Sequence, residues 1–205
     1  MPRPHNPNLK DDLLDAALSL LSLRGDAAFS MRDLAKEVDY AVTAIYRVFR
    51  SRSDLLRAMQ LRLFEQLQAE LLEELNPSAT PEAQLRHMGA SFVRWGVQNP
   101  AAYHLMFHNT EADALLSPEE QSLARAPLRG LETLIIHGNE RGDWSIPAPE
   151  AAALGLFATL HGLLSLHLFG RLTTDTSADP LVYYSAWTDQ WLAGVRRHTT
   201  EASRA

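Results

Sequence analysis

The stretch that decides the fold is Phe29–Leu56, FSMRDLAKEVDYAVTAIYRVFRSRSDLL. Ser30 precedes Asp33 by three positions, and in such a pair the serine hydroxyl and the carboxylate cap the first turn of a helix reciprocally. Apolar residues then recur at the spacing of one helical face, at Met31, Leu34, Ala35 and Val38. The sequence therefore predicts a short helix that begins after Ser30.

A turn and a second short helix are expected next. Asp39-Tyr40-Ala41 is the predicted turn, because aspartate adopts the left-handed backbone conformation more readily than most other residues with a side chain. The helix from about Val42 to Phe49 would bury Ala41, Ile45 and either Phe49 or Val48. Its other side carries small residues, a tyrosine and Arg47. The small residues can approach thymine methyl groups, and the arginine can reach guanine O6 and N7 or a phosphate.

A third helix is predicted after a second pair of the same kind, Ser51 and Asp54, and it carries a leucine-rich face. Arg52 lies in its first turn, where backbone N–H groups and the helix dipole favour an anion, so we assign it a DNA phosphate. Together the three segments are interpreted as a DNA-reading helix-turn-helix. The predicted DNA contacts are Ser30, Arg32, Val42, Thr43, Ala44, Tyr46, Arg47 and Arg52.

This run resembles the tetracycline-repressor (TetR) family of transcription regulators over roughly the first 75 residues. The matching positions are Ser30, Leu34-Ala35, Tyr40, Ile45-Tyr46, Phe49, Ser51, Arg52, Asp54 and Leu55. The chain departs from the family pattern at Asp39, where the family has glycine, and at Ala41, where a polar residue often opens the recognition helix. The resemblance implies a homodimeric repressor that leaves a palindromic double-stranded DNA operator when a small effector binds.

Composition excludes several classes of protein. The 205 residues contain no cysteine, which excludes disulfides, thiolate catalysis and cysteine-ligated metals. The net charge is −6, but residues 1–60 hold nine basic and eight acidic residues. DNA affinity depends on where the positive charges lie, so this mildly basic head is compatible with DNA binding. The amino-terminal segment lacks the apolar stretch of a secretory signal, and we expect a cytoplasmic protein.

Helix starts recur through the rest of the chain as a capping residue followed by proline, for example at Thr80-Pro81 and Ser117-Pro118. Asn8, with Asp11 three positions on, is expected to cap the first helix. The sequence predicts an all-α fold of about nine helices, the later ones near 81–98, 100–108, 118–140, 149–171 and 180–199. We divide it into a disordered tail (1–8), a helix-turn-helix domain (9–56) with a linking helix to about 75, an effector-binding and dimerisation domain (76–199) and a tail (200–205).

Residues 151–170 contain no charged side chain over twenty positions, the length of a membrane span. Histidines, hydroxyls and glycines dilute the segment, so we expect no membrane association and interpret it as a helix buried on two sides. Its stripe of small residues would allow close approach to a second copy, assisted by aromatic residues of the last helix. The predicted dimer interface is Gly155, Ala158, Gly162, Ser165, Tyr184, Trp187 and Trp191.

Apolar and aromatic residues of the body are the candidates for an effector site, which suits a lipophilic or aromatic molecule. Leu160-His161-Gly162 stands at the Trp-His-Gly position of a family subgroup. The alternative role for each of these residues is plain core packing. The predicted set is Met88, Ser91, Phe92, Trp95, Tyr103, Met106, Phe107, Leu131, Ile135, Phe157 and His161.

No catalytic or cofactor motif is present, and we expect no enzyme activity, cofactor or metal. His104 and His108 are four residues apart and can share a helix face, but no third ligand is evident nearby. The competing hypothesis is an all-α small-molecule carrier or enzyme that does not act on DNA.

Overall fold

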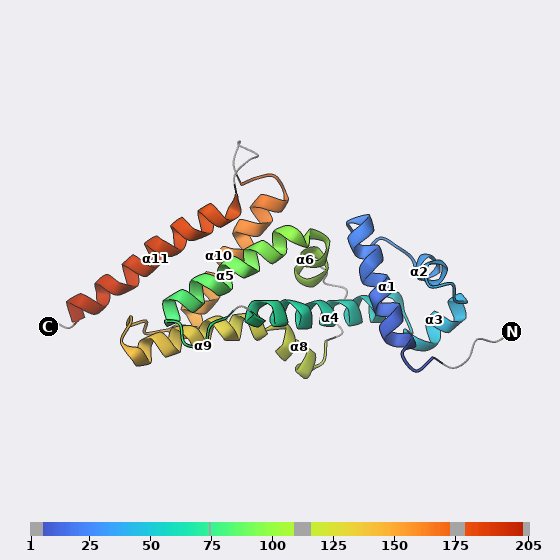
Figure 1. Cartoon of the computed structure of the whole chain (residues 1–205), viewed down its shortest axis with the longest axis horizontal. Coiled ribbons are helices and arrows are strands. Elements are labelled where there is room, and N and C mark those ends of the chain that lie inside the picture. Colours follow the sequence, from blue (N-terminus) through green and yellow to red (C-terminus); the bar gives the residue numbers. More distant parts are fainter. Residues whose placement is uncertain (1–5, 74, 109–115, 173–178, 203–205) are drawn as a thin grey trace. The chain divides into compact units, whose positions relative to one another are not determined.

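The computed structural model describes residues 6–73, 75–108, 116–172 and 179–202, with side chains to residue 196 (Figure 1). Within these ranges the chain forms ten helices and no strand, which confirms the all-α prediction. The chain divides into two compact units. The first comprises Met1–Gln66 and Asn99–Ala124, and the second comprises Leu67–Gln98 and Arg125–Ala205.

The first unit contains five whole helices and the start of a sixth: α1 (Leu9–Arg24), α2 (Met31–Glu37), α3 (Val42–Val48), α6 (Pro100–Phe107), α8 (Pro118–Ala124) and α4 (Arg52–Glu73), whose last turns belong to the second unit. α1 packs against α2, α3 and α6. One face of α1 supplies leucines to the core, and Gly25 ends the helix at a positive φ of 76°.

The cap of α1 differs from the prediction. Asn8 occupies the N-cap position, but its side chain makes no capping hydrogen bond. Asn6 takes over this role: its Oδ1 accepts the Asn8 N–H at 2.9 Å, and its Nδ2 donates to Asp12 Oδ2 at 2.7 Å. The backbone at Asn8 has a ψ of 9° rather than an extended one, and an N-cap side chain reaches the first-turn N–H groups best from extended backbone.

α6 and α8 pack with the first unit, whereas the sequence-based division placed them in the second domain. Gln60 of α4 is fully buried, and its Nε2 donates to the Met106 carbonyl of α6 at 3.0 Å. Phe64 of α4 meets Phe107 of α6 edge to face, with ring centroids 5.5 Å apart. A buried amide and an aromatic pair therefore hold α6 against α4.

The second unit contains α5 (Pro81–Gln98), α9 (Ala126–Arg141), α10 (Pro149–Leu168) and α11 (Pro180–Ala202) (Figure 1). α5 packs against the other three helices, and α10 packs against α9 and α11. The starts of α5, α8, α10 and α11 lie at the predicted prolines. The helix predicted over 118–140 is two helices, α8 and α9, because Pro127 lacks the backbone N–H that an unbroken helix would need.

Two glycines let aromatic rings reach helix backbones in the second unit. A Cβ at Gly89 of α5 would lie 2.0 Å from the hydroxyl of Tyr184, which donates to the Leu85 carbonyl at 3.2 Å. A Cβ at Gly138 of α9 would lie 2.1 Å from the ring of Trp144, whose Nε1 donates to the Ile135 carbonyl at 2.9 Å. These contacts fix α11 on α5 and the α9–α10 connection on α9.

α10 is the one described helix that is long and apolar enough to cross a membrane by length and composition, with a mean hydropathy of 1.5 over its most apolar window. Such a single helix is weak support for a membrane protein, since core helices pass the same test. Only 22% of that window is buried inside the chain. Its inner face packs on α9, α5 and α11, and its outer face is solvent-exposed.

Candidate nucleic-acid interface

The start of α2 is held by the predicted reciprocal cap. The Asp33 N–H donates to Ser30 Oγ at 3.2 Å, and the Ser30 N–H donates to Asp33 Oδ2 at 2.8 Å. The Ser30 N–H and the Ser30 hydroxyl, which donates to the same Oδ2 at 2.7 Å, lower the pKa of the Asp33 carboxyl below its ordinary value of 3.8, with a contribution from the nearby Arg24 guanidinium. The carboxylate is therefore charged at neutral pH and holds the entry to the helix-turn-helix.

The turn between α2 and α3 is built around Asp39. Its φ of 52° is the one positive value at a described residue other than glycine, as the sequence predicts. The Tyr40 N–H donates to the Ala35 carbonyl at 2.9 Å, which closes the last turn of α2. Aspartate tolerates this conformation, so the turn forms although the family's glycine is missing.

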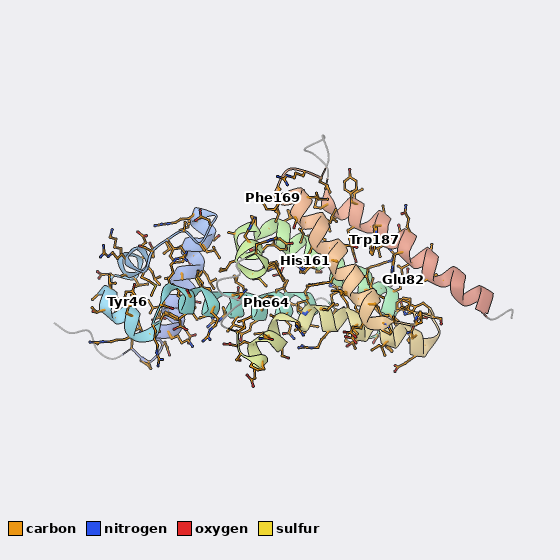
Figure 2. The ribbon with its side chains drawn as sticks, turned by 180° about the vertical axis from the view of Figure 1, so that it is seen from behind. Tyr46, Phe64, Glu82, His161, Phe169 and Trp187 are labelled. Carbon is orange, nitrogen blue, oxygen red and sulfur yellow. The ribbon has the colours of Figure 1, made fainter. Side chains whose placement is uncertain are left out.

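α3 has an inner face fixed in the core and an outer face that is free to contact DNA. Ile45 and Phe49 are buried, with exposed fractions of 0% and 2%. Ala41, which was predicted to be buried with them, is exposed, because it is the N-cap residue with extended backbone before the helix begins. Thr43, Tyr46 and Arg47 are exposed, and the Tyr46 side chain keeps 48% of its surface in solvent (Figure 2). Val42 and Ala44 are half-buried on the same helix. The structure thus brings five of the predicted DNA contacts together on one short helix.

The remaining predicted DNA contacts lie at the starts of α2 and α4. Ser30 and Arg32 are exposed next to the α2 cap. Arg50 is exposed just before α4, and its N–H donates to Asp54 Oδ2 at 3.1 Å. Arg52 differs: it is half-buried, and its guanidinium donates to the Ala27 carbonyl. One guanidinium N–H of Arg52 therefore braces the α1–α2 connection, and its phosphate contact stays a prediction.

The predicted effector residues divide between the two units. Tyr103, Met106 and Phe107 belong to α6 in the first unit; Tyr103 and Met106 are buried there, and Phe107 contacts Phe64. The others lie in the second unit, where Met88, Ser91, Phe92, Trp95, Leu131 and Ile135 are buried, and Phe157 and His161 are half-buried.

Three rings of the second unit form a cluster between α5 and α10. The centroids of Phe92 and Phe157 are 5.8 Å apart, those of Phe92 and His161 are 5.2 Å apart, and those of Phe157 and His161 are 4.3 Å apart at 82°. Figure 2 labels His161 on α10. Ser91 Oγ lies 3.4 Å from His87 Nε2 on α5. The three rings therefore link α5 to α10.

The predicted dimer residues of α10 lie on its outer face. Gly155, Ala158 and Gly162 are exposed, Ser165 is half-buried, and a Cβ at either glycine would meet nothing within 4 Å. On α11, Trp187 and Trp191 are half-buried and stacked, with ring centroids 6.4 Å apart; Figure 2 labels Trp187. Tyr184 is an exception to the prediction: it is only 5% exposed, and its hydroxyl is bonded to α5 of its own chain.

Large apolar side chains that the sequence prediction missed flank this stripe. They are Leu154, Leu166 and Phe169 of the α10 segment and Val182 and Tyr183 of α11, each between 41% and 63% exposed. The spacing of Leu154, Ala158, Gly162 and Leu166, four residues apart, was the signal that could have revealed them. We call this whole surface the α10–α11 face.

Two family models match this chain, one in its amino-terminal part and the other in its carboxy-terminal part. One, described as "Bacterial regulatory proteins, tetR family", matches residues 13–59. The other, described as "Tetracyclin repressor-like, C-terminal domain", matches residues 85–185. The first covers α2, the turn and α3; the second covers α5, α9, α10 and the start of α11.

A curated relative and solved structures are similar to this chain. The "HTH-type transcriptional repressor KstR" of Mycolicibacterium smegmatis is 34% identical over 88 residues, 43% of each chain, so the match spans less than half of that relative. A protein of unknown function from Rhodococcus sp. RHA1 has a TM-score of 0.79 at 24% identity, over 96% of this chain and 100% of the other. A bacterial regulatory protein of the tetR family from Rhodococcus RHA1 has a TM-score of 0.69 at 20% identity, over 93% and 98%. The structures establish the shared fold.

Proposed function

Since this chain belongs to the tetracycline-repressor family, we propose that it is a DNA-binding transcription repressor that places α3 in the major groove. The observation that carries the proposal is the two-sided character of α3. Ile45 and Phe49 anchor the helix in the core, while Thr43, Tyr46 and Arg47 face solvent. A helix held rigidly from one side with a short polar face on the other is suited to reading base edges.

Charge around α3 supports this role. Arg32, Arg47 and Arg50 are exposed on or beside the helix-turn-helix. With so few cations, contacts to phosphates supply modest sequence-independent affinity. Specific binding then depends on base contacts made twice, once by each copy of the chain, on a site with two-fold symmetry. In that arrangement the two half-sites lie about one DNA turn apart, on the order of 34–36 Å.

The experiment is a selection of bound duplexes from a random DNA library at 150 mM salt, followed by binding measurements on the enriched sequence. We expect a palindrome. Tyr46→Ala and Arg47→Ala should each weaken binding by about 1–3 kcal/mol per half-site contact. Arg129→Ala, which removes an exposed charge from α9 of the second unit, is the matched control and should bind as the wild type does. No enrichment of any sequence would overturn the proposal.

The chain acts as a homodimer through the α10–α11 face in this proposal. Exposed apolar side chains on two adjacent helices form a surface of the kind that soluble monomers rarely leave uncovered. The glycines at 155 and 162 leave room above α10 for a second helix to approach closely. A sedimentation experiment that finds only monomer at micromolar concentration would contradict this part.

The effector is proposed to be a lipophilic or aromatic molecule that binds at the ring cluster of Phe92, Phe157 and His161. Effector binding would favour a spacing between the dimer's two helix-turn-helix domains that no longer matches the operator. A ligand shifts such an equilibrium by its differential affinity for the two states. The protein acts in the cytoplasm, where its DNA is, and no catalytic step is assigned to it. Thermal unfolding with naphthalene, and with glucose 6-phosphate as a polar control, tests the ligand class: only the aromatic probe should raise the melting temperature, and Phe92→Ala should abolish the rise. A rise with the sugar phosphate alone would contradict the ligand class.

A further inference from the structure

Two histidine rings meet at the end of α6, in the first unit. His104 and His108 are both exposed, their ring centroids are 5.1 Å apart, and their planes are inclined at 44°. His108 is the C-cap residue of α6, and its N–H donates to the His104 carbonyl at 3.0 Å. The pair therefore lies one turn apart at the point where α6 ends, and the backbone at His108 has already left the helical conformation, with φ −126° and ψ 3°.

This separation fits two imidazoles bound to one metal ion. Zinc–nitrogen bonds are about 2.0–2.1 Å long, which puts each ring centroid about 3.2 Å from the ion and two centroids about 5.2 Å apart at a tetrahedral angle. We propose that His104 and His108 together bind a divalent late transition-metal ion. Imidazole ligands suit Zn²⁺, Ni²⁺ and Cu²⁺, and among these Cu²⁺ binds a given nitrogen site most tightly.

A buried aromatic side chain supports the end of α6 beside the pair. Tyr103, which is buried, contacts His108 at 5.6 Å between ring centroids and Phe107 at 5.2 Å, so the helix end is packed on one side.

Two protein ligands define what kind of site this is. Among the described residues no group of three or more histidine, cysteine or acidic side chains could hold a metal, so water completes the coordination. Such a site is suited to an ion that binds reversibly rather than one that the fold requires. A bound ion would tie His108 to the preceding turn of α6, the helix whose Met106 carbonyl accepts from Gln60 of α4.

The test is calorimetric titration of the full chain with CuCl₂ and with ZnCl₂, in wild type, His104→Gln, His108→Gln and the double variant. Loss of a direct ligand costs at least as much as loss of an outer partner, so we expect each single variant to weaken metal binding by about tenfold or more. Because both rings share one ion, each single variant should keep only a weak one-histidine site, and the two single losses in binding free energy should sum to more than the loss in the double variant. His137→Gln, an exposed histidine of α9, is the matched control and should leave the affinity unchanged.

Two results would overturn the proposal. One is equal affinity in wild type and in both single variants. The other is a wild type that binds two ions at this pair while each single variant loses one equivalent at unchanged affinity, which would show two independent single-histidine sites. The metal titration does not involve DNA, so its result tests this proposal independently of the proposed function.

Discussion

Gly162 offers a substitution whose effect on the isolated chain and on the dimer should have opposite signs. In the isolated chain, a Cβ at Gly162 meets nothing within 4 Å. Glycine inside a helix costs roughly 0.5–1 kcal/mol relative to alanine. Gly162→Ala should therefore raise the free energy of unfolding of the isolated chain by that amount, which corresponds to about 1–4 °C in a domain of this size.

The dimer should respond in the other direction if α10 packs closely against its copy. A methyl group inserted into a well-packed contact costs about 1–3 kcal/mol, and a symmetric interface receives it twice. The gain in helix propensity is present in both monomer and dimer, so it cancels in the dissociation equilibrium. We expect the dimer to dissociate at least about 30-fold more readily, and Gly162→Leu to exceed Gly162→Ala.

Sedimentation equilibrium measures the dissociation constant, and thermal unfolding below that concentration measures the stability of the monomer. Thr133→Ala on α9 is the control, because it raises helix propensity at an exposed position away from the α10–α11 face. It should stabilise the chain without changing dissociation. If Gly162→Ala raises the melting temperature but leaves the dissociation constant unchanged, α10 does not form the close contact and this reasoning is wrong.

Three further substitutions test the internal contacts. Gly138→Ala should destabilise the second unit by about 1–3 kcal/mol in urea unfolding, because its methyl group would overlap the Trp144 ring; no change would mean that the ring moves aside freely. Tyr184→Phe should cost about 1 kcal/mol for the lost hydrogen bond to α5 while dimerisation persists; a dimer that falls apart instead would return this residue to the interface. The pKa of Asp33 is lowered by folding, so its stabilising effect is full above pH 3.8 and is lost as pH falls further, through the lowered value. Ser30→Ala should move that pKa back towards 3.8 in an NMR titration, and an unshifted titration would contradict the cap.

The helix-turn-helix could be predicted because its signals are local. The cap at Ser30, the turn at Asp39 and the inward side chains of α3 all depend on residues within one or two turns of each other. The proline-marked helix starts are equally local. The family and the all-α fold were predictable for the same reason, because both follow from these local motifs, and both are confirmed.

The features that the sequence did not reveal depend on tertiary partners. Tyr184 points toward α5 because Gly89, which has no side chain, leaves space for its ring on that helix. Nothing near Tyr184 in the sequence reveals this. The partner of Arg52 is a carbonyl 25 residues away, at Ala27. α6 packs with the first unit because Gln60 finds a backbone carbonyl 46 residues away. The break before α9 is different, because Pro127 in the sequence itself predicts the start of a new helix.

The central claim is that the outer face of α3 lies in the major groove of a two-fold symmetric site. Methylation interference on the selected duplex tests it directly, because dimethyl sulfate marks guanine N7 in the major groove. Interference should occur in two symmetric major-groove clusters about one turn apart. In Tyr46→Ala or Arg47→Ala protein, interference should be lost at matching positions of both half-sites. Interference that is absent, or identical in wild type and both variants, would contradict the claim.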